Sequence, residues 1–308
     1  MRVVVTGATS FIGAVTVRRL LEADHQVYAV VRPGSRHMAN LLEQIPEESR
    51  RRVEQIALDL REIGRISEFV LDGRMDAWVH IGWDGAGSDN RTKRDVQQEN
   101  VQYALAAVQA AAGLGCRRFL FTGSQAEYGV CHELIGEETP CHPVSEYGKA
   151  KLDFYDQAKS LCKILKMEYI HTRIFSVYGP GDHPWSLVQS CLRTWQEGGI
   201  MKLGECTQKW NFLYIEDMAA ALVCLLTEGQ AGVYNIAGKD TRILKDYIEE
   251  MYRLCGSRGS YLYGERPQNA EGPADLMPDI SKICRETGWR PQTTFAEGIH
   301  ETLHSLRP

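Results

Sequence analysis

The fold class is decided by the N-terminal stretch Arg2-Val3-Val4-Val5-Thr6-Gly7-Ala8-Thr9-Ser10-Phe11-Ile12-Gly13. An apolar run ends at Gly7, and the periodic pattern of a helix follows it. Backbone N–H groups at the start of such a helix face an anion, so a strand, a glycine turn and a helix in this order favour a dinucleotide site. Gly7 permits the tight turn, and Gly13 permits close packing of the helix. Ser10 stands where the usual fingerprint has its middle glycine. The residues expected to bind the cofactor here are Gly7, Ser10, Phe11, Ile12 and Gly13. An ordinary glycine turn is the alternative.

The same alternation of apolar runs and helical patterns continues through the first half of the chain. Buried strands are predicted at 3–5, 27–31, 55–58, 78–81, 119–121 and 169–174, and helical patterns lie at 14–23 and 101–112. Strands that alternate with helices predict right-handed crossovers and a parallel sheet that is covered on both faces. We therefore expect an α/β fold with a doubly wound Rossmann sheet at residues 1–175. Residues 176–308 are expected to form mainly a smaller substrate-binding lobe, with 203–230 returning to the first domain and a last helix near 295–306.

Composition excludes several classes of protein. The chain has 308 residues, 24% of them charged, and a net charge of -5 without a basic stripe, which argues against a nucleic-acid partner. Its nine cysteines show no C-x-x-C pair and no ligand spacing with histidine, so we expect reduced thiols and no metal site. There is no signal-peptide core and no run of ~20 apolar residues. The expectation is a soluble, cytoplasmic protein that does not bind a membrane.

The end of the second predicted strand bears on the choice of dinucleotide. It reads Val30-Val31-Arg32-Pro33-Gly34-Ser35-Arg36 and contains no carboxylate. An acidic residue there would bond a ribose 2′-hydroxyl, whereas an arginine receives a 2′-phosphate. Arg32, supported by Ser35 or Arg36, therefore favours NADP, with NAD as the other possibility. The alternative is that these are surface arginines over a bound adenine.

A catalytic group is predicted from Tyr147 and Lys151, which lie four residues apart on one face of a predicted helix. A phenol has an ordinary pKa of about 10, and a nearby ammonium lowers it toward the range of a useful proton shuttle. Ser124 follows the strand at 119–121 and is placed to bond the reacting oxygen. A second Tyr-x-x-x-Lys pair, Tyr155 and Lys159, lies further from the strand ends, and we expect it to be core or surface.

The motifs together resemble the extended short-chain dehydrogenase/reductase family, which includes nucleotide-sugar epimerases, dehydratases and ketoreductases. In that resemblance Ser124, Tyr147 and Lys151 match the catalytic trio, and Tyr147 and Lys151 also contact the cofactor. It further implies an adenine contact at Asp59 and Leu60, a nicotinamide-ribose contact at Gly82 and Trp83, and a polar anchor at Asn100. Phe175 lies in the segment that resembles the crossing into the substrate lobe. The resemblance covers nearly the whole chain.

Some positions depart from the patterns of particular family branches. Dehydratases place Thr-Asp-Glu at the catalytic serine, whereas this chain has Ser124-Gln125-Ala126-Glu127, and epimerases usually have Arg-Asp where it has Trp210-Asn211. The combination is most similar to the branch that reduces nucleotide-activated 4-keto-6-deoxy sugars. We therefore expect an NAD(P)-dependent oxidoreductase that reduces a 4-keto group of a nucleotide sugar, or catalyses the reverse oxidation. The alternatives are a 4-epimerase that retains its NAD and, in another class, a non-catalytic dinucleotide-binding sensor.

Candidate substrate contacts follow from position next to the catalytic serine and the nicotinamide segment. They are Trp83, Ser124, Gln125 and Glu127, with Ser176 and Arg266 expected near a substrate diphosphate. Packing within loops is the alternative role. The family resemblance also implies a homodimer built on helices at 147–165 and 101–112. The small residues Ala104, Ala107 and Ala111 would permit close helix packing there, or would pack on the sheet of their own subunit.

Overall fold

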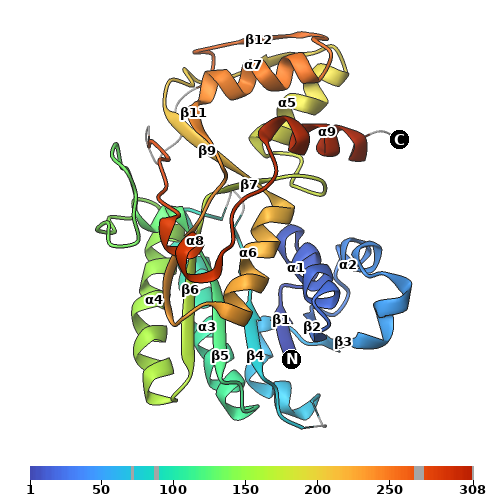
Figure 1. Cartoon of the computed structure of the whole chain (residues 1–308), viewed down its shortest axis with the longest axis vertical. Coiled ribbons are helices and arrows are strands. Elements are labelled where there is room, and N and C mark those ends of the chain that lie inside the picture. The colour runs from blue at the N-terminus through green and yellow to red at the C-terminus, as the bar shows by residue number, and fades with distance from the viewer. Residues whose placement is uncertain (71–72, 87–89, 267–273, 307–308) are drawn as a thin grey trace.

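A seven-stranded parallel sheet forms the base of the molecule in the computed structural model, which describes residues 1–70, 73–86, 90–266 and 274–306 (Figure 1). The strand order is β10-β6-β5-β4-β1-β2-β3, and each neighbouring pair is parallel. The strands are β1 (Arg2–Thr6), β2 (Gln26–Val31), β3 (Val53–Ala57), β4 (Ala77–His80), β5 (Arg118–Ser124), β6 (Glu168–Ile174) and β10 (Gly232–Ile236). The expected α/β fold with a doubly wound sheet is confirmed.

Helices cover both faces of this sheet, which explains why the strands are apolar on both sides. On one face lie α1 (Phe11–Glu22) and α6 (Ile215–Glu228), with α2 (Met38–Gln44) beside α1 and α8 (Ser281–Thr287) beside α6. On the other face lie α3 (Arg94–Gly113), α4 (Glu146–Ile164) and the 3₁₀ segment η2 (Leu60–Glu68). The strand order reverses between β1 and β4, and ligands bind at such a point in open α/β sheets.

Helix α3 begins seven residues before the predicted pattern at 101–112. The inner face of its first turns carries polar side chains instead of apolar ones. The side chains of Gln97 and Asn100 are buried there and form hydrogen bonds with the loop that precedes the helix. An apolar periodicity therefore does not reach the first two turns. The small residues Ala104, Ala107 and Ala111 are fully buried in the core of their own subunit. They do not form an open surface for a partner, and the homodimer stays a prediction.

The chain returns to the sheet after the middle of the sequence. Helix α6 packs against α1, and β10 then pairs with β6 as the seventh strand. The return predicted at 203–230 therefore includes α6, but the strand that follows it was missed. Between Ser176 and Tyr214 the chain has already visited the smaller lobe.

The smaller lobe lies above the sheet in Figure 1 and is assembled from separate segments. A three-stranded sheet has the order β11-β9-β7, and two further strands, β8 and β12, pair in parallel. The elements of the lobe are β7 (Ser176–Tyr178), α5 (Leu187–Gln196), β8 (Ile200–Lys202), β9 (Lys209–Tyr214), β11 (Thr241–Ile243), α7 (Leu244–Leu254), β12 (Ser260–Leu262) and α9 (Phe295–Ser305). One apolar core runs from α1 and α6 into this lobe. Within the described ranges, no helix is long and apolar enough to cross a membrane.

Candidate active site

A cavity of about 920 Å³ lies where the strands β1, β2, β4, β5 and β6 end. Most of the residues predicted to bind a dinucleotide line it. They are Gly7, Ser10, Phe11, Ile12, Arg32, Ser35, Asp59, Leu60, Gly82, Trp83, Tyr147, Lys151 and Phe175, and Ser124 lines it as well. The sequence motifs thus converge on one hollow, as the carboxyl ends of parallel strands do.

The glycine turn is shaped by close backbone contacts. Gly7 has a φ of +69°, and a Cβ there would lie 2.6 Å from the backbone nitrogen of Gly82. A Cβ on Gly13 would lie 2.0 Å from the carbonyl oxygen of Gly7, so Gly13 serves the packing of α1 and does not line the cavity. Ser10 caps α1: its Oγ accepts from the Gly13 N–H at 3.0 Å. The hydroxyl proton of Ser10 stays available to a ligand at the exposed start of the helix.

At the end of β2 the cavity is bordered by charged groups. Arg32 is exposed and lines the cavity together with Ser35, whereas Arg36 is exposed and lies outside the lining. Asp59 caps η2 and is paired with Arg61, whose Nε donates to Asp59 Oδ1 at 2.9 Å. That hydrogen bond holds the pKa of Asp59 below its ordinary value. A positive guanidinium and an ionised carboxylate therefore border this end of the cavity.

The loop after β4 is fixed by two buried amides of α3. Asn100 Oδ1 accepts from the Asp84 N–H, and Asn100 Nδ2 donates to the Asp84 carbonyl, both at 2.7 Å. Gln97 accepts from Trp83 Nε1 at 2.8 Å. Asn100 does not line the cavity, so the expected cofactor contact is replaced by a contact with the loop that carries Trp83. Asn100 thus anchors the loop, as the resemblance implies, but its side chain does not reach the cavity in which the cofactor was expected.

The three predicted catalytic residues come from two elements that meet at the floor of the cavity. Ser124 ends β5, and its Oγ accepts from the Ala126 N–H at 3.2 Å. Tyr147 and Lys151 lie on the first turns of α4, whose cap Ser145 accepts from the Gly148 N–H at 3.2 Å. The Arg91 guanidinium lies 4.3 Å from the centre of the Tyr147 ring. All three residues line the larger cavity, and their catalytic role stays a prediction.

Lys151 is 2% exposed and held by contacts on several sides. Its Nζ donates to the Thr122 carbonyl at 2.8 Å and lies 3.8 Å from the centre of the Trp83 ring. Burial lowers the pKa of Lys151 to about 7, against the opposing charge of Glu127 and with a smaller contribution from Arg91. Burial thus brings the pKa of this ammonium close to neutrality.

The second Tyr-x-x-x-Lys pair lies elsewhere. Tyr155 packs edge-on against His171, with ring centres 4.8 Å apart, and Lys159 lies over the Tyr155 ring. Neither residue lines the cavity at the strand ends. Position relative to the sheet, and not the motif itself, separates the two pairs.

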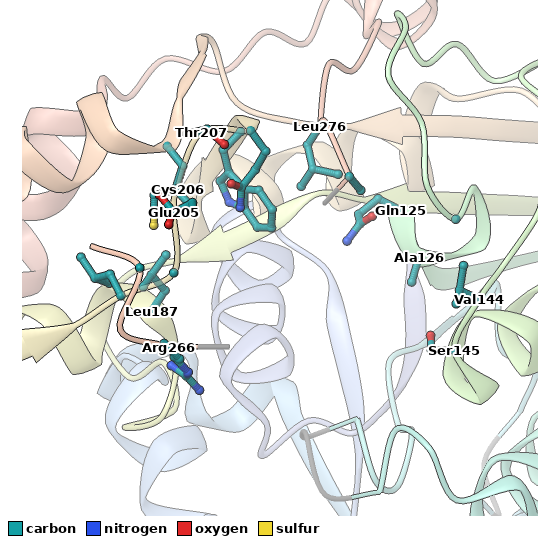
Figure 2. A pocket seen from close by; sticks show the side chains of 18 residues that line it. Gln125, Ala126, Val144, Ser145, Leu187, Glu205, Cys206, Thr207, Arg266 and Leu276 are labelled. Atoms are coloured by element: carbon teal, nitrogen blue, oxygen red, sulfur yellow. The ribbon is translucent and has the colours of Figure 1, made fainter. Parts of the chain in front are cut away.

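A second cavity, of about 540 Å³, lies between the sheet and the smaller lobe (Figure 2). Gln125, Ala126 and Ser145 line it from the Rossmann side. The segment 203–208 lines it from the side of the lobe, together with Trp210 and Arg266. Gln125 and Arg266 thus line a cavity, as expected of substrate contacts. Ser124 lines the larger cavity and Gln125 the smaller one, so consecutive residues border the two hollows.

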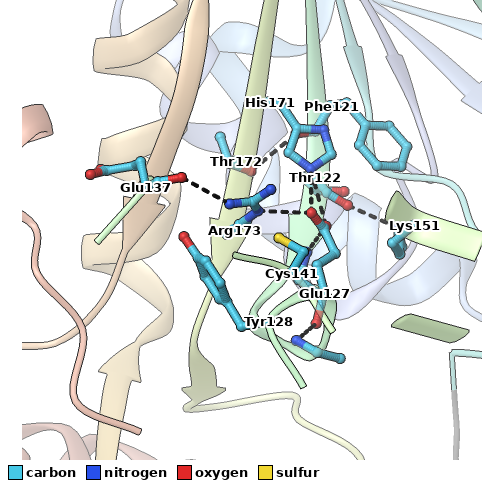
Figure 3. A network of polar contacts seen from close by, with 12 residues as sticks. Phe121, Thr122, Glu127, Tyr128, Glu137, Cys141, Lys151, His171, Thr172 and Arg173 are labelled. Atoms are coloured by element: carbon cyan, nitrogen blue, oxygen red, sulfur yellow. Dashed lines mark hydrogen bonds and ion pairs between the residues drawn. The ribbon is translucent and has the colours of Figure 1, made fainter. Parts of the chain in front are cut away.

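Two of the expected substrate contacts face elsewhere. Glu127 is 0% exposed and its carboxylate points into the protein, where it meets His171 and Arg173 (Figure 3). The expected direct contact of Glu127 with substrate is therefore wrong, because no surface of this side chain is accessible. Ser176 pairs with Phe212 in the lobe sheet and lines neither cavity.

Residues 3–237 match the model of the NAD dependent epimerase/dehydratase family. The chain belongs to this family.

Relatives of this epimerase/dehydratase family member share its whole length. The dTDP-glucose 4,6-dehydratase of Escherichia coli is 24% identical and covers 99% of this chain and 93% of its own. A crystal structure of UDP-glucose 4-epimerase from Thermotoga maritima with UDP-glucose has a TM-score of 0.88 at 20% identity, covering 99% and 98%. A dTDP-glucose 4,6-dehydratase from Streptomyces venezuelae with NAD and TYD bound has a TM-score of 0.86 at 24% identity, covering 99% and 96%. These relatives are dehydratases and a 4-epimerase, and not specifically the 4-ketoreductases that the motifs led us to expect.

Several cavity residues of this family member were not predicted from the sequence. Arg61, Arg91, Asp182 and Trp185 line the larger cavity, and the segment 203–208 lines the smaller one. Arg91 lies in a loop without a regular pattern, and the segment 203–208 carries no motif beyond its glycine. The departure at Trp210 was a usable signal, since that ring lines the smaller cavity. Asn211 is buried instead, and its Nδ2 donates to the Gly238 carbonyl at 3.1 Å.

Proposed function

We propose that the chain is a nucleotide-sugar 4-epimerase, which binds NAD in the larger cavity and the nucleotide sugar in the smaller one. The observation that carries the proposal is that the consecutive residues Ser124 and Gln125 border the two cavities. A sugar in the smaller cavity would then reach the catalytic trio, which lines the larger one. The diphosphate of the substrate would lie near Arg266, whose guanidinium is suited to phosphate oxygens.

The residues present fit a dinucleotide. A side chain on Gly7 would collide with the backbone of Gly82, so the turn carries none. A pyrophosphate would therefore have direct access to the N–H groups at the start of α1. Gly7, Ser10, Phe11 and Ile12 would hold the pyrophosphate, while Asp59 and Leu60 would border the adenine. When bound, the nicotinamide accepts a hydride from the substrate and returns it. The Streptomyces relative supports this arrangement, since it was solved with NAD bound.

The chemistry of the chain's own residues follows from their positions. Tyr147, as phenolate, takes the proton from the substrate 4-hydroxyl as the hydride leaves, and gives it back when the hydride returns. The Lys151 ammonium stabilises the phenolate because an opposite charge nearby favours it. Ser124 donates its hydroxyl proton to the reacting oxygen, while its Oγ accepts from the Ala126 N–H. An intact trio lining a cavity argues against a non-catalytic sensor.

Elimination of water, the reaction of a 4,6-dehydratase, is not supported by the groups beside Ser124. That reaction needs a general acid and a general base next to the sugar. Here Gln125 and Ala126 face the smaller cavity, and the carboxylate of Glu127 is buried behind them. Hydride removal and return need no further acid. A 4-epimerase also needs space for the 4-keto sugar to turn over, and a cavity of about 540 Å³ supports such a rotation.

A second candidate is an NADPH-dependent reductase of a 4-keto nucleotide sugar. Arg32 favours it, since this exposed arginine borders the cavity where a 2′-phosphate would lie. A reductase exchanges its cofactor in every cycle, whereas an epimerase regenerates it. The two candidates therefore differ in the cofactor that they prefer and in whether they consume it.

Purified protein tests the proposal. Any bound dinucleotide is released by denaturation and identified, and the protein is then incubated with UDP-glucose, dTDP-glucose and their 4-epimers. Interconversion of a pair of 4-epimers without net NADH formation is expected, and Tyr147→Phe serves as the inactive control. Stoichiometric NADPH consumption with a 4-keto nucleotide sugar, and no interconversion, would replace the epimerase with the reductase.

A further inference from the structure

A buried ionic cluster lies directly behind the catalytic serine and has no part in the chemistry described so far. Its centre is Glu127, at the end of the 3₁₀ segment η3 (Gln125–Glu127). The carboxylate accepts from Arg173 Nε at 2.9 Å and from His171 Nε2 at 2.9 Å. Glu127, His171 and Arg173 are each at most 3% exposed. Burying a carboxylate costs free energy unless the group is paired with a positive charge and hydrogen-bonded. The partners of Glu127 therefore have to offset the cost of removing its charge from water.

The compensation is complete on the protein side. Burial alone raises the pKa of Glu127, but the charges and hydrogen bonds of His171 and Arg173 outweigh it, so that pKa lies below its ordinary value. The ionised carboxylate only accepts, so Nε2 of His171 carries the proton. Nδ1 of the same ring forms a hydrogen bond with the Tyr169 hydroxyl at 2.7 Å. Both ring nitrogens of His171 are therefore hydrogen-bonded, and the Glu127 carboxylate is also paired with the Arg173 guanidinium.

The cluster reaches the catalytic serine through the backbone. Glu127 Oε1 accepts from the Ser124 N–H at 2.8 Å, while Ser124 Oγ accepts from the Ala126 N–H. These reciprocal contacts form a capping box, which fixes the dihedral angles of Ser124 as well as its side chain. The position of Ser124 Oγ thus depends on a carboxylate that no ligand touches.

Space for this carboxylate is provided by Gly123. A Cβ at that position would lie 2.5 Å from Glu127 Oε1 and 2.5 Å from His171 Nε2. It would also lie 2.4 Å from the Thr172 carbonyl oxygen. Any other residue between Thr122 and Ser124 would displace the ion pair. The absence of a side chain at 123 is an observation independent of the hydrogen bonds, and it supports the same arrangement.

The cluster also reaches the catalytic lysine by its charge. Lys151 Nζ donates to the Thr122 carbonyl, two residues before Ser124 (Figure 3). Among the groups that act on the pKa of Lys151, Glu127 raises it, whereas burial and Arg91 lower it. The groups that face Glu127 are His171, Arg173 and Tyr169 from β6, Lys151 from α4, and Cys141 from the preceding loop. Among these groups Glu127 carries the carboxylate, so it is the source of negative charge that acts on Lys151.

We propose that Glu127 is a positioning residue, which holds the backbone of Ser124 through its side chain and places a buried negative charge behind the site that Lys151 and Tyr147 share. The proposal rests on the proposed function only for the roles of Ser124, Tyr147 and Lys151. It assigns a task to a carboxylate that lies outside both cavities. If Glu127 loses its charge, we expect Lys151 to lose its proton more easily. If the side chain is shortened, we expect the backbone of Ser124 to shift.

Three variants separate these tasks. Glu127→Gln keeps the shape and removes the charge, and Glu127→Asp keeps the charge and shortens the reach. The matched control is Glu137→Gln: Glu137 contacts the same cluster through its carbonyl, which accepts from Arg173 Nη1, but it does not contact Ser124. Far-ultraviolet circular dichroism and urea unfolding verify that each variant folds.

The first measurement is the pH dependence of kcat and KM. In Glu127→Gln we expect the limb on which activity falls at high pH to move down by about one pH unit or more. At a pH above that limb, kcat falls ~10-fold or more while KM changes less than about threefold. Glu127→Asp lowers kcat with the limb unmoved, and Glu137→Gln behaves as wild type. A purely structural Glu127 would lower stability and leave the limb of Glu127→Gln in place, which would overturn the proposal.

The second measurement needs no substrate. The phenolate of Tyr147 is titrated by ultraviolet absorbance as the difference from Tyr147→Phe, and its midpoint should rise in Glu127→Gln. This readout stands even if the epimerase reaction is absent, so the failure of one proposal is distinguishable from the failure of the other. An unmoved midpoint contradicts the proposal. If Glu127→Gln does not fold, Glu127→Asp decides: a kcat within about twofold of wild type overturns it.

Discussion

The Nζ of Lys151 lies 3.8 Å from the centre of the Trp83 ring, so the cation that we propose to be catalytic is covered by an aromatic face at the edge of the larger cavity. The indole attracts the ammonium through its quadrupole and at the same time excludes water from it. Trp83 is held in turn by Gln97. The pKa of Lys151 thus depends on its burial beneath the Trp83 ring and on the charges of Glu127 and Arg91.

Removal of the proton shuttle should abolish turnover without loss of the cofactor. Tyr147→Phe is expected to lower kcat by ~100-fold or more, because only the phenol oxygen is deleted, and NAD binding should change less than about threefold. Steady-state kinetics and fluorescence titration with NADH measure the two effects. Tyr155→Phe is the matched control and should retain kcat. The reverse pattern would show that the wrong Tyr-x-x-x-Lys pair had been chosen.

The buried Lys151 should make stability depend on pH in a defined direction. Its pKa in the folded protein is about 7, below the ordinary value of 10.5. Between these values the unfolded chain holds a proton that the folded chain does not, so stability rises with pH in that window. Compared with Lys151→Met, wild type should gain about 1–2 kcal/mol between about pH 7 and about pH 9. Urea unfolding at both pH values measures it; parallel stabilities of the two proteins would contradict it.

The cofactor preference depends on Arg32. If the guanidinium receives a 2′-phosphate, Arg32→Ala should weaken NADPH binding ~10-fold or more and NADH binding less than about threefold. Arg36→Ala is the control, because Arg36 lies outside the cavity lining. Calorimetric titration with both dinucleotides gives the four constants. Equal losses would make Arg32 a surface residue over the adenine, and a wild type that prefers NADH favours the epimerase.

The packing of α1 on the glycine turn should not tolerate a methyl group. Gly13→Ala places a Cβ 2.0 Å from the Gly7 carbonyl oxygen, so the helix must shift. We expect a loss of about 1–3 kcal/mol in the free energy of unfolding and a clear loss of dinucleotide binding. Gly64→Ala is the control, because a Cβ there meets nothing within 4 Å. A Gly13→Ala protein with wild-type stability would contradict the geometry.

The homodimer is open to a direct measurement. Light scattering at micromolar concentration should give twice the mass of the 308-residue chain. The surface would have to come from the outer faces of α3 and α4, because Ala104, Ala107 and Ala111 are buried within the subunit. Ile164, 76% exposed near the end of α4, is one apolar residue available there. A monomeric mass would remove the prediction.

Local motifs predicted what depends on neighbours in sequence. Gly7 and Gly13 act through the turn they share, and Tyr147 and Lys151 through one turn of a helix, so spacing pointed to them; position after the predicted strand was needed to set Tyr147 apart from Tyr155. Glu127 was misjudged because its partners His171 and Arg173 are more than forty residues away and decide which way its side chain turns. Strand β10 was missed for a related reason. Its buried Asn235 reads as a polar break, but Ile135 and Tyr128 from distant segments satisfy that amide.

The late entry of β10 into the sheet limits how this protein could be cut or recombined. A shortened chain ending near residue 175 would contain the glycine turn and the catalytic trio, yet its β6 would present an unpaired row of backbone groups where β10 now lies. It would also lack α6, leaving part of one sheet face bare. Such a fragment is an aggregation hazard and not a minimal enzyme. Exchange of substrate specificity between relatives therefore requires grafting at the segments 176–214 and 241–306 together, with α6 and β10 kept from the host.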